Sequence, residues 1–356
     1  MNNRGIIPGG GISGKSIQHN DIFEKIISLE NLFLAWREFC RGKRKKVDVQ
    51  EFEINLENNI FKLHNELKNF TYQHSQYTTF SVRDPKLRQI NKAIVRDRVL
   101  HHAIFRVLCP IFDKNFIFDS YSCRNGKGVH LAVKMLGSFL RKSSKNNHKN
   151  IFVLKCDIRK FFDSINQEIL LEIIKKKVED KKTLRLLEKI INSFEKEKNT
   201  GLPLGNVTSQ LFANIYMNEL DQFMKHALKA RFYLRYSDDF IVISEDQEYF
   251  KTLVVSIEEF LRATLKLKLH EDKIIIRKYR QGIDFLGYIV SPNHIVLRTK
   301  TRRRIMRKIK QGFSNLEDDL ISAEYFNQSL QSYLGMLKHC SGHGIKKEIG
   351  NLFASE

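Results

Sequence analysis

Three acidic residues lie beside apolar runs in which a carboxylate is unexpected. Asp157 follows the run IFVLKC, and Asp238 and Asp239 interrupt the stretch FYLRYSDDFIVIS. Burying a lone carboxylate is costly, and a divalent cation shared by several carboxylates removes that cost. Hard oxygen ligands favour Mg²⁺ or Mn²⁺. Two such ions can activate an attacking hydroxyl and stabilise the leaving oxygen of a phosphoryl transfer. The alternative is an ordinary turn, because Asp is common in hairpin turns.

The elements that must position these carboxylates can be read from the apolar periodicity. A buried strand is predicted at 151–158 and a hairpin at 232–244. A second hairpin is predicted at 77–90, with Asp84-Pro85 as its turn. Further strands are expected near 273–278 and 283–290, and helices at 21–39, 51–69, 94–109, 128–142, 166–177, 183–197, 206–229 and 250–265. Helices between non-adjacent strands favour an α+β fold over a regular βαβ array.

The overall charge indicates a polyanionic partner. The 356 residues include 61 Lys and Arg against 40 Asp and Glu, which gives a formal net charge of +21. Such a surplus suits nucleic acid or anionic lipid. No apolar run reaches the length of a membrane span, and we expect no secretory signal. The five cysteines form no CxxC pair. We therefore expect no disulfide framework and a reducing, cytoplasmic setting.

Several blocks resemble those of reverse transcriptases. Tyr236-Ser237-Asp238-Asp239 is similar to the YxDD box, and residues 155–162, KCDIRKFF, resemble the first palm block. Residues 120–124, SYSCR, followed by GKG at 126–128 are similar to the fingers block of intron-type enzymes. Residues 267–269 with Lys273, and then FLGY at 285–288, resemble the last two palm blocks. The five blocks occur in the family's order, and the resemblance covers roughly residues 30–345.

The resemblance implies a right-hand polymerase that copies a template RNA into cDNA. We expect a leader at 1–20, N-terminal helices and fingers at 21–150, a palm at 151–290, and a small, basic helical thumb at 291–356. By analogy with the family, Asp157 and Asp238 would bind two Mg²⁺ ions, or Mn²⁺, and Asp239 would assist. Deoxynucleoside triphosphates would be the substrates, and the protein would be encoded by a bacterium or phage.

The same resemblance assigns nucleotide-binding residues. Phe162 would act as a steric gate, because its ring would collide with a 2′-OH; the alternative is an ordinary core aromatic. Lys86 and Arg88 on the predicted hairpin, together with Arg124, could hold the triphosphate. A solvated basic face is the alternative for these three cations. Lys273 falls in the matching palm block, and it is expected in the nucleotide site together with Leu204 and Gly205.

The stretch GLPLGNVTSQLFANIY at 201–216 suggests the subfamily. Most families carry Gln-Gly where this chain has Leu204-Gly205, and end the block in Ser-Pro where it has Ser209-Gln210. The aliphatic residue and the NxTSQ ending resemble reverse transcriptases of diversity-generating retroelements. Those enzymes misincorporate at template adenines and use a helical, basic accessory protein. Two alternatives stay open: a phage-defence polymerase with its own non-coding RNA, and a non-catalytic RNA-binding protein. Longer intron maturases and retron enzymes fit the chain less well.

The segment after the predicted palm is strongly basic. Eight cations crowd it without an acid among them: Arg298, Lys300, Arg302, Arg303, Arg304, Arg307, Lys308 and Lys310. Like charges on successive helical turns repel, so we expect this segment to grip the backbone of a template–primer. A merely solvated face is the alternative. The run at 41–46 could bind RNA or an acidic protein. Residues 9–16 match a phosphate-loop pattern without its strand, so we expect no nucleotide there. His339, Cys340 and His343 lack a complete set of metal ligands.

Overall fold

The computed structural model describes residues 21–83 and 87–354, and it begins with a layer of helices. These are α1 (Ile22–Ile27), α2 (Leu29–Phe39), α3 (Val47–Ile54), α4 (Leu56–Lys68) and α5 (Val95–Asp113). The helix predicted at 21–39 is two helices, because Ser28 leaves the helical conformation and its side chain accepts a hydrogen bond from the Asn31 N–H, 3.2 Å away. The helix predicted at 51–69 is likewise divided, at Asn55. The predicted 94–109 helix continues to Asp113.

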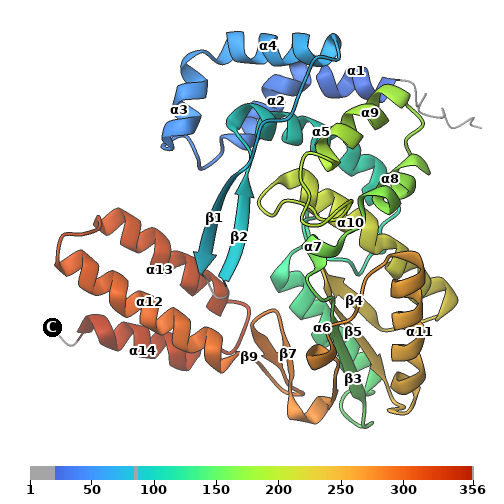
Figure 1. Cartoon of the computed structure of the whole chain (residues 1–356). Coiled ribbons are helices and arrows are strands. Elements are labelled where there is room, and N and C mark those ends of the chain that lie inside the picture. The colour runs from blue at the N-terminus through green and yellow to red at the C-terminus, as the bar shows by residue number, and fades with distance from the viewer. Residues whose placement is uncertain (1–20, 84–86, 355–356) are drawn as a thin grey trace, which may run out of the picture.

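An antiparallel ribbon projects from this layer between α4 and α5. Strands β1 (Thr78–Arg83) and β2 (Leu87–Lys92) pair from Thr78 opposite Lys92 to Arg83 opposite Leu87, which confirms the hairpin predicted at 77–90. Its expected turn, Asp84-Pro85, and Lys86 lie outside the described residues. Both strands are largely exposed, and in Figure 1 the ribbon extends from the helical layer toward the C-terminal helices.

A four-stranded antiparallel sheet forms the centre of the molecule. Its strands are β3 (Phe152–Asp157), β4 (Tyr233–Tyr236), β5 (Asp239–Ser244) and β6 (Ile275–Lys278), in the order β4-β5-β3-β6. Helix α6 (Val129–Ser143) packs on one face with Val153 and Ile241. Helix α11 (Tyr249–Thr264) packs on the other face with Leu154 and Val242. Side chains alternate between the faces along each strand, so β3 and β5 bury apolar residues on both faces of the sheet.

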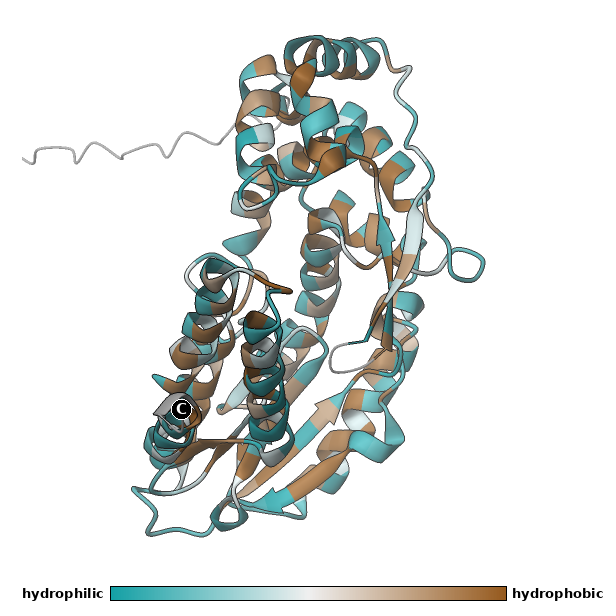
Figure 2. Cartoon of the chain, turned by 90° about the vertical axis from the view of Figure 1, so that its left-hand side faces the viewer, coloured by the Kyte–Doolittle hydropathy of each residue, from teal (hydrophilic) through white to brown (hydrophobic). Residues whose placement is uncertain are grey.

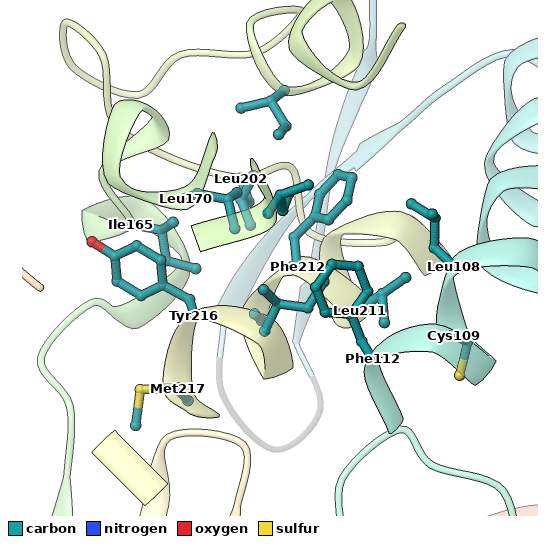
Figure 3. Close-up of a cluster of buried hydrophobic side chains, with 14 of the residues drawn as sticks. Leu108, Cys109, Phe112, Ile165, Leu170, Leu202, Leu211, Phe212, Tyr216 and Met217 are labelled. Atoms are coloured by element: carbon teal, nitrogen blue, oxygen red, sulfur yellow. The ribbon is translucent and has the colours of Figure 1, made fainter. Parts of the chain in front are cut away.

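A second core joins this sheet to the N-terminal layer. It contains α7 (Phe161–Ser164), α8 (Gln167–Lys175), α9 (Lys181–Ile191) and α10 (Val207–Gln222), which continues as the π-helical turn η2 (Phe223–Ala227). Figure 3 shows Leu211 and Phe212 of α10 with Leu108 and Phe112 of α5 in this core. The Tyr216 hydroxyl donates to the carbonyl oxygen of Leu265, 2.6 Å away. Helix α10 is therefore packed on several sides, and the loop that precedes it is firmly held.

A small sheet and three helices complete the described chain. The sheet contains β7 (Ile283–Phe285), β8 (Tyr288–Val290) and β9 (Ile295–Leu297), so the single strand predicted at 283–290 is a hairpin that turns at Leu286-Gly287. The helices are α12 (Thr299–Glu317), α13 (Ala323–Leu337) and α14 (His343–Ala354). Figure 2 shows that each carries both hydrophilic and hydrophobic residues. None of the described helices is long and apolar enough to cross a membrane. The predicted α+β class is confirmed.

Candidate active site

Three carboxylates meet at one end of the four-stranded sheet. Asp157 is the last residue of β3 and lies directly opposite Asp239, the first residue of β5. Asp238 lies in the two-residue turn between β4 and β5, and its carbonyl oxygen accepts a hydrogen bond from the Ile158 N–H, 3.3 Å away. Ser237, the other turn residue, has a φ of 57° in the left-handed region. The structure thus brings together the three acids that the sequence singled out.

Burial makes the charges of two of these carboxylates costly. It raises the pKa of Asp238, and the neighbouring Asp157 carboxylate raises that pKa further. It also raises the pKa of Asp239 to about 6, although the nearby Lys155 ammonium opposes this effect. Carboxylates in this state gain from any cation that can replace their lost hydration.

Two lysines supply part of that compensation. The Lys273 Nζ atom lies 2.5 Å from Oδ1 of Asp157, and the Lys155 Nζ atom lies 3.2 Å from Oδ2 of Asp239. Lys273 was predicted from the sequence as a nucleotide-site residue, and it contacts a carboxylate of the same cluster. Lys155 was not predicted, although its position two residues before Asp157 on a strand places it on the same face of the sheet.

The donor chemistry of the cluster suits Mg²⁺. The Oδ1 atom of Asp239 is buried without a hydrogen-bond partner, so it is available to a metal ion. All of the candidate donors are carboxylate oxygens, which Mg²⁺ prefers. Within residues 21–83 and 87–354, however, no group of three His, Cys, Asp or Glu side chains is already arranged to hold a metal. Two of the three carboxylates are instead engaged by Lys273 and Lys155.

A pocket of about 530 Å³ opens above the carboxylates. Five further residues predicted for the nucleotide site line it: Arg88, Phe162, Leu204, Gly205 and Lys273. Phe162 is half-buried, and its ring lies against that of Phe161 with centroids 5.4 Å apart. The other lining residues include Ser122, Cys123, Lys160, Asp163, Asn206, Gln210 and Leu286, which the sequence had not assigned to the site. Lys160 and Asp163 flank Phe161 and Phe162 in the sequence. Because they lie so close to Asp157 along the chain, they could have been predicted as residues of the same site.

The loop that carries Leu204 is fixed by its main chain. The carbonyl oxygen of Leu204 accepts a hydrogen bond from the Asn91 N–H, 2.9 Å away, and the Asn206 side chain donates to the Asn91 carbonyl oxygen, 3.0 Å away. Gly205 has a φ of +112°, and a Cβ atom there would come within 2.8 Å of Ile90 Cγ2. Only glycine fits this close approach to β2. The main-chain position of Leu204 is therefore set by contacts that do not involve its side chain, and that side chain lines the pocket.

A buried ion pair beneath the turn was missed by the sequence analysis. Arg235 is fully buried, and its Nη2 atom lies 2.6 Å from Oδ2 of Asp221 on α10. The guanidinium also donates from Nη1 to the Ser237 carbonyl oxygen at 2.8 Å and from Nη2 to Oγ of Ser120 at 3.2 Å. The available signal was an arginine inside the otherwise apolar strand YLRY, where a charge requires a partner. Its partner lies 14 residues away along the chain, so spacing alone could not identify it.

Arg124 does not line the pocket above the carboxylates. Its Nε atom pairs with Oδ1 of Asp113 at 2.6 Å, and its Nη1 atom donates to the carbonyl oxygens of Ile117 and Ser120. The side chain is 8% exposed and holds the end of α5 to the following loop. The predicted contact with a triphosphate is therefore not supported by its position, because its donors are engaged in the fold. Lys86 lies outside the described residues.

The basic segment predicted as a nucleic-acid grip is helix α12. Arg302, Arg303, Arg307 and Lys310 line a groove of about 740 Å³ along it. Arg302 lies 2.8 Å from a Glu348 carboxylate oxygen of α14. Arg298 lies outside this groove, because it precedes the helix and pairs with Asp284 at 3.1 Å. Lys300 is exposed at the start of α12, and Arg304 and Lys308 do not line the groove.

The remaining motifs are the phosphate-loop pattern at 9–16 and the cluster of His339, Cys340 and His343. Residues 9–16, which match the phosphate-loop pattern, lie outside the described residues. His339 and Cys340 lie at the end of α13, and the His339 ring stacks on His130 with centroids 3.8 Å apart. Cys340 is partly buried, and its Sγ atom lies 4.0 Å from the carbonyl oxygen of Leu337.

Comparison with known proteins reveals clear relatives. The sequence model of a family described as reverse transcriptase (RNA-dependent DNA polymerase) matches residues 81–290. Protein YkfC of Escherichia coli is 26% identical over 265 residues, which cover 63% of this chain and 67% of YkfC. The putative COX1/OXI3 intron 2 protein of Saccharomyces cerevisiae is 22% identical, covering 73% of this chain and 37% of that protein. The group II intron-encoded protein LtrA of Lactococcus lactis is 23% identical, covering 57% of this chain and 44% of LtrA.

The chain therefore spans less than half the length of these two intron-encoded relatives. Solved structures with some likeness include telomerase from Candida tropicalis in complex with a fragment of telomeric RNA, at 13% identity and a TM-score of 0.47 over 80% of this chain and 55% of that one. A partial Cas6-RT-Cas1–Cas2 complex has 19% identity and a TM-score of 0.40, over 68% of this chain and 42% of that one.

Proposed function

The chain belongs to the reverse transcriptase (RNA-dependent DNA polymerase) family, and we propose that it copies a template RNA into cDNA by adding deoxynucleotides to a primer 3′-OH. The observation that carries the proposal is the meeting of Asp157, Asp238 and Asp239 at the floor of a pocket that also holds Phe162 and Leu204. A non-catalytic RNA-binding protein with this fold would have no need to bring these acids together, because the charges of Asp238 and Asp239 are costly there.

The proposed roles follow from the position of each side chain. Asp157 and Asp238 would hold two Mg²⁺ ions, with Asp239 assisting, and these ions would supply charge stabilisation at the attacking and leaving oxygens. Lys273, now 2.5 Å from Asp157, would be free to bind the triphosphate once a metal has replaced it at that carboxylate. Arg88 projects into the same pocket from β2 and offers a planar fork for phosphate oxygens. Phe162 would exclude a 2′-OH.

We assign the expected parts of a polymerase hand to the observed elements. Residues 21–150, with the β1–β2 ribbon, would be the fingers, and residues 151–290 with the four-stranded sheet would be the palm. Residues 291–356 would be the thumb, in which the cations along the α12 groove grip the template–primer backbone. The protein would act in the cytoplasm of a bacterium, encoded either by the bacterium itself or by an infecting phage.

Leu204 supports a finer proposal, that the enzyme belongs to a diversity-generating retroelement. Its aliphatic side chain lines the catalytic pocket and offers no hydrogen bond to a nucleotide or template base there. The relatives found by sequence are intron-encoded proteins and YkfC, which share the polymerase region with this chain. In the retroelement case an accessory helical protein would accompany the enzyme; in the phage-defence case a dedicated non-coding RNA would.

Primer extension tests the polymerase proposal. The wild-type protein should extend a DNA primer on an RNA template in Mg²⁺, and chelation should stop it. Asp238→Asn should abolish synthesis and leave RNA binding nearly intact, since no basic residue is changed. Asp246→Asn, which alters an acid in the exposed turn after β5, is the control and should extend normally. Near-normal synthesis by Asp238→Asn would refute the metal assignment.

A further inference from the structure

A second groove lies at the end of the central sheet opposite the carboxylates. It has a volume of about 390 Å³ and lies between α6, the turn from β8 to β9, and the segment that joins α13 to α14. Tyr279 in its floor donates its N–H to the carbonyl oxygen of Ile151, just before β3, whereas Asp157 ends β3. A strand of six residues spans roughly 20 Å, and the two cavities share no lining residue. This groove is therefore separate from the catalytic pocket.

The charged side chains around this groove are all basic. Lys134 and Arg141 project from α6 and Lys338 from the end of α13, and all three are exposed. His294 and His339 also line the groove, and no Asp or Glu does. Within the described ranges, none of the three cations forms an ion pair with a carboxylate. A concave surface lined by cations of one sign attracts anions from solution.

The walls of the groove are held in place without a ligand. Gly137 of α6 lies against β8, where an added Cβ atom would be 3.7 Å from Val290 Cγ1. The Ser341 N–H donates to the carbonyl oxygen of Ile295 at 2.7 Å and attaches the α13–α14 segment to β9. The Tyr279 hydroxyl donates to the carbonyl oxygen of Ser291 at 3.3 Å and fixes the turn. A preformed groove loses little conformational entropy on binding.

We propose that this groove binds the sugar–phosphate backbone of a single RNA strand at a site outside the catalytic pocket. Lys134 and Arg141 are seven residues apart on one helix, or about 10.5 Å, so the two side chains can contact different phosphates of one strand. None of the large exposed hydrophobic side chains lies in the groove, so it lacks the apolar anchors of a membrane-binding surface. The preference for phosphates rests on the groove alone, whereas the choice of RNA rests on the proposed function.

The consequence is a second grip on the template RNA. The catalytic pocket and the α12 groove both hold the template through its duplex with the primer, so the RNA is released when that duplex dissociates. A strand held at the far end of the sheet as well would rebind at a high effective concentration. RNAs long enough to reach both sites would therefore bind more tightly than short ones, with no change in the chemistry at Asp157.

Salt-dependent RNA binding tests this proposal. The groove variant Lys134→Gln/Arg141→Gln/Lys338→Gln is compared with a matched control, Lys181→Gln/Lys198→Gln/Arg262→Gln, which removes the same charge from other exposed positions. The probe is an unstructured RNA of about 40 nucleotides, several times a typical single-strand site. Fluorescence anisotropy should show a log–log salt slope shallower by about 2 for the groove variant, since each phosphate contact contributes about 0.7. The control should keep the wild-type slope.

Other arms separate the alternatives. Lys134→Arg/Lys338→Arg should bind RNA like the wild type, because the charges are kept. Equal slopes for the groove variant and the control would overturn the proposal. It would also be overturned if the groove variant lost binding to phosphatidylserine vesicles, or to a DNA of the same sequence, while RNA binding was unchanged. Extension of a short primer–template should be unaffected in the groove variant. Failure of the wild type to extend any primer would instead count against the proposed function.

Discussion

Arg235 donates from Nη1 to the carbonyl oxygen of Ser237, 2.8 Å away, and so holds the turn that carries Asp238 from inside the protein. Ser237 is in the left-handed region, which a non-glycine residue adopts only where its surroundings favour it. The arginine is in turn held by Asp221, whose two carboxylate oxygens accept from Nε at 2.7 Å and from Nη2 at 2.6 Å. The geometry of the candidate metal ligands therefore depends on an ion pair that faces no substrate.

Asp221→Asn should destabilise the protein strongly. The substitution keeps the shape of the side chain and leaves the guanidinium of Arg235 buried without a counter-charge, which typically costs about 3–5 kcal/mol. Urea denaturation measures the change in the free energy of unfolding. The control is Glu248→Gln, which breaks an exposed pair with Lys251 and should cost less than about 1 kcal/mol. Comparable losses in the two variants would show that the buried pair has no special role.

Burial of His101 predicts a loss of stability in mild acid. Burial, together with the neighbouring His74 and His102, lowers the pKa of His101 to about 3. The unfolded chain, with an ordinary pKa near 6.5, binds the proton more readily, so stability is lost as the pH falls below about 6.5. Between about pH 7.5 and pH 5.5 this group should cost roughly 1.4 kcal/mol.

The test of that effect is a comparison of pH dependences. In urea denaturation, His101→Gln should lose less stability between the two pH values than the wild type, whatever its stability at neutral pH. His294→Gln, at an exposed position, is the control and should keep the wild-type pH dependence. An unchanged pH dependence in His101→Gln would mean that other groups account for the acid sensitivity.

The sequence allowed the catalytic strands to be predicted because their signals are local. The apolar runs at 151–158 and 232–244 contain β3, β4 and β5, and their acids could be singled out because carboxylates are rare there. The hairpin at 77–90 was predicted from alternation and Asp84-Pro85. Helix breaks at Ser28 and Asn55 were missed, since apolar spacing continues across both positions; at Ser28 the side chain caps the next helix, and at Asn55 the backbone leaves the helical conformation without a side-chain cap. Strand β9 has only three residues, too few for a periodic signal.

Long-range partners account for most of what the sequence could not predict. Arg124 looked available for a triphosphate because nothing near it in sequence showed that Asp113 would pair with it. Arg235 looked like an interruption of an apolar strand until α10 brought Asp221 beside it. In both cases the residue type was visible, but the tertiary contact that decides its role was not.

Phe162 should control the choice of sugar. It is half-buried and lines the catalytic pocket. Phe162→Ala should admit ribonucleotides, because removal of the ring opens space for a 2′-OH. Single-nucleotide insertion kinetics give the ratio of kcat/KM for deoxy- and ribonucleotides. Phe162→Tyr keeps the ring and should keep the discrimination. If Phe162→Ala prefers deoxynucleotides as strongly as the wild type, the residue is part of the core only.

The groove along α12 should grip duplex backbone through one face of the helix. Arg303, Arg307 and Lys310 line it at helical spacing, whereas Arg302 is paired with Glu348. Changing the three groove cations to Gln should weaken template–primer binding similarly for all sequences. The log–log salt slope should fall by up to about 3 if each cation touches a phosphate of the duplex. Lys181→Gln/Lys198→Gln/Arg262→Gln is the charge-matched control. An unchanged slope in the groove variant would mean that these side chains face solvent.

Leu204 offers the sharpest test of the subfamily. Its main chain is fixed by the hydrogen bond from Asn91, so a substitution changes the pocket wall without moving the loop. Leu204→Gln would add a donor and an acceptor where the wild type has only hydrocarbon. One neutral hydrogen bond contributes on the order of 1 kcal/mol, or about a fivefold change in error rate. We therefore expect misincorporation at template adenines to fall several-fold, with smaller changes at other bases.

Deep sequencing of cDNA made from one defined RNA measures this effect. Leu204→Met is the matched control, since it keeps an apolar side chain of similar volume and should keep the wild-type error spectrum. If Leu204→Met lowers errors at adenines as much as Leu204→Gln does, packing rather than hydrogen bonding sets the fidelity. If the wild-type enzyme copies adenines as faithfully as other bases, the retroelement proposal is wrong. The phage-defence alternative would then be favoured. A phage-defence enzyme is distinguished from other reverse transcriptases by its choice of RNA and not by errors at one template base.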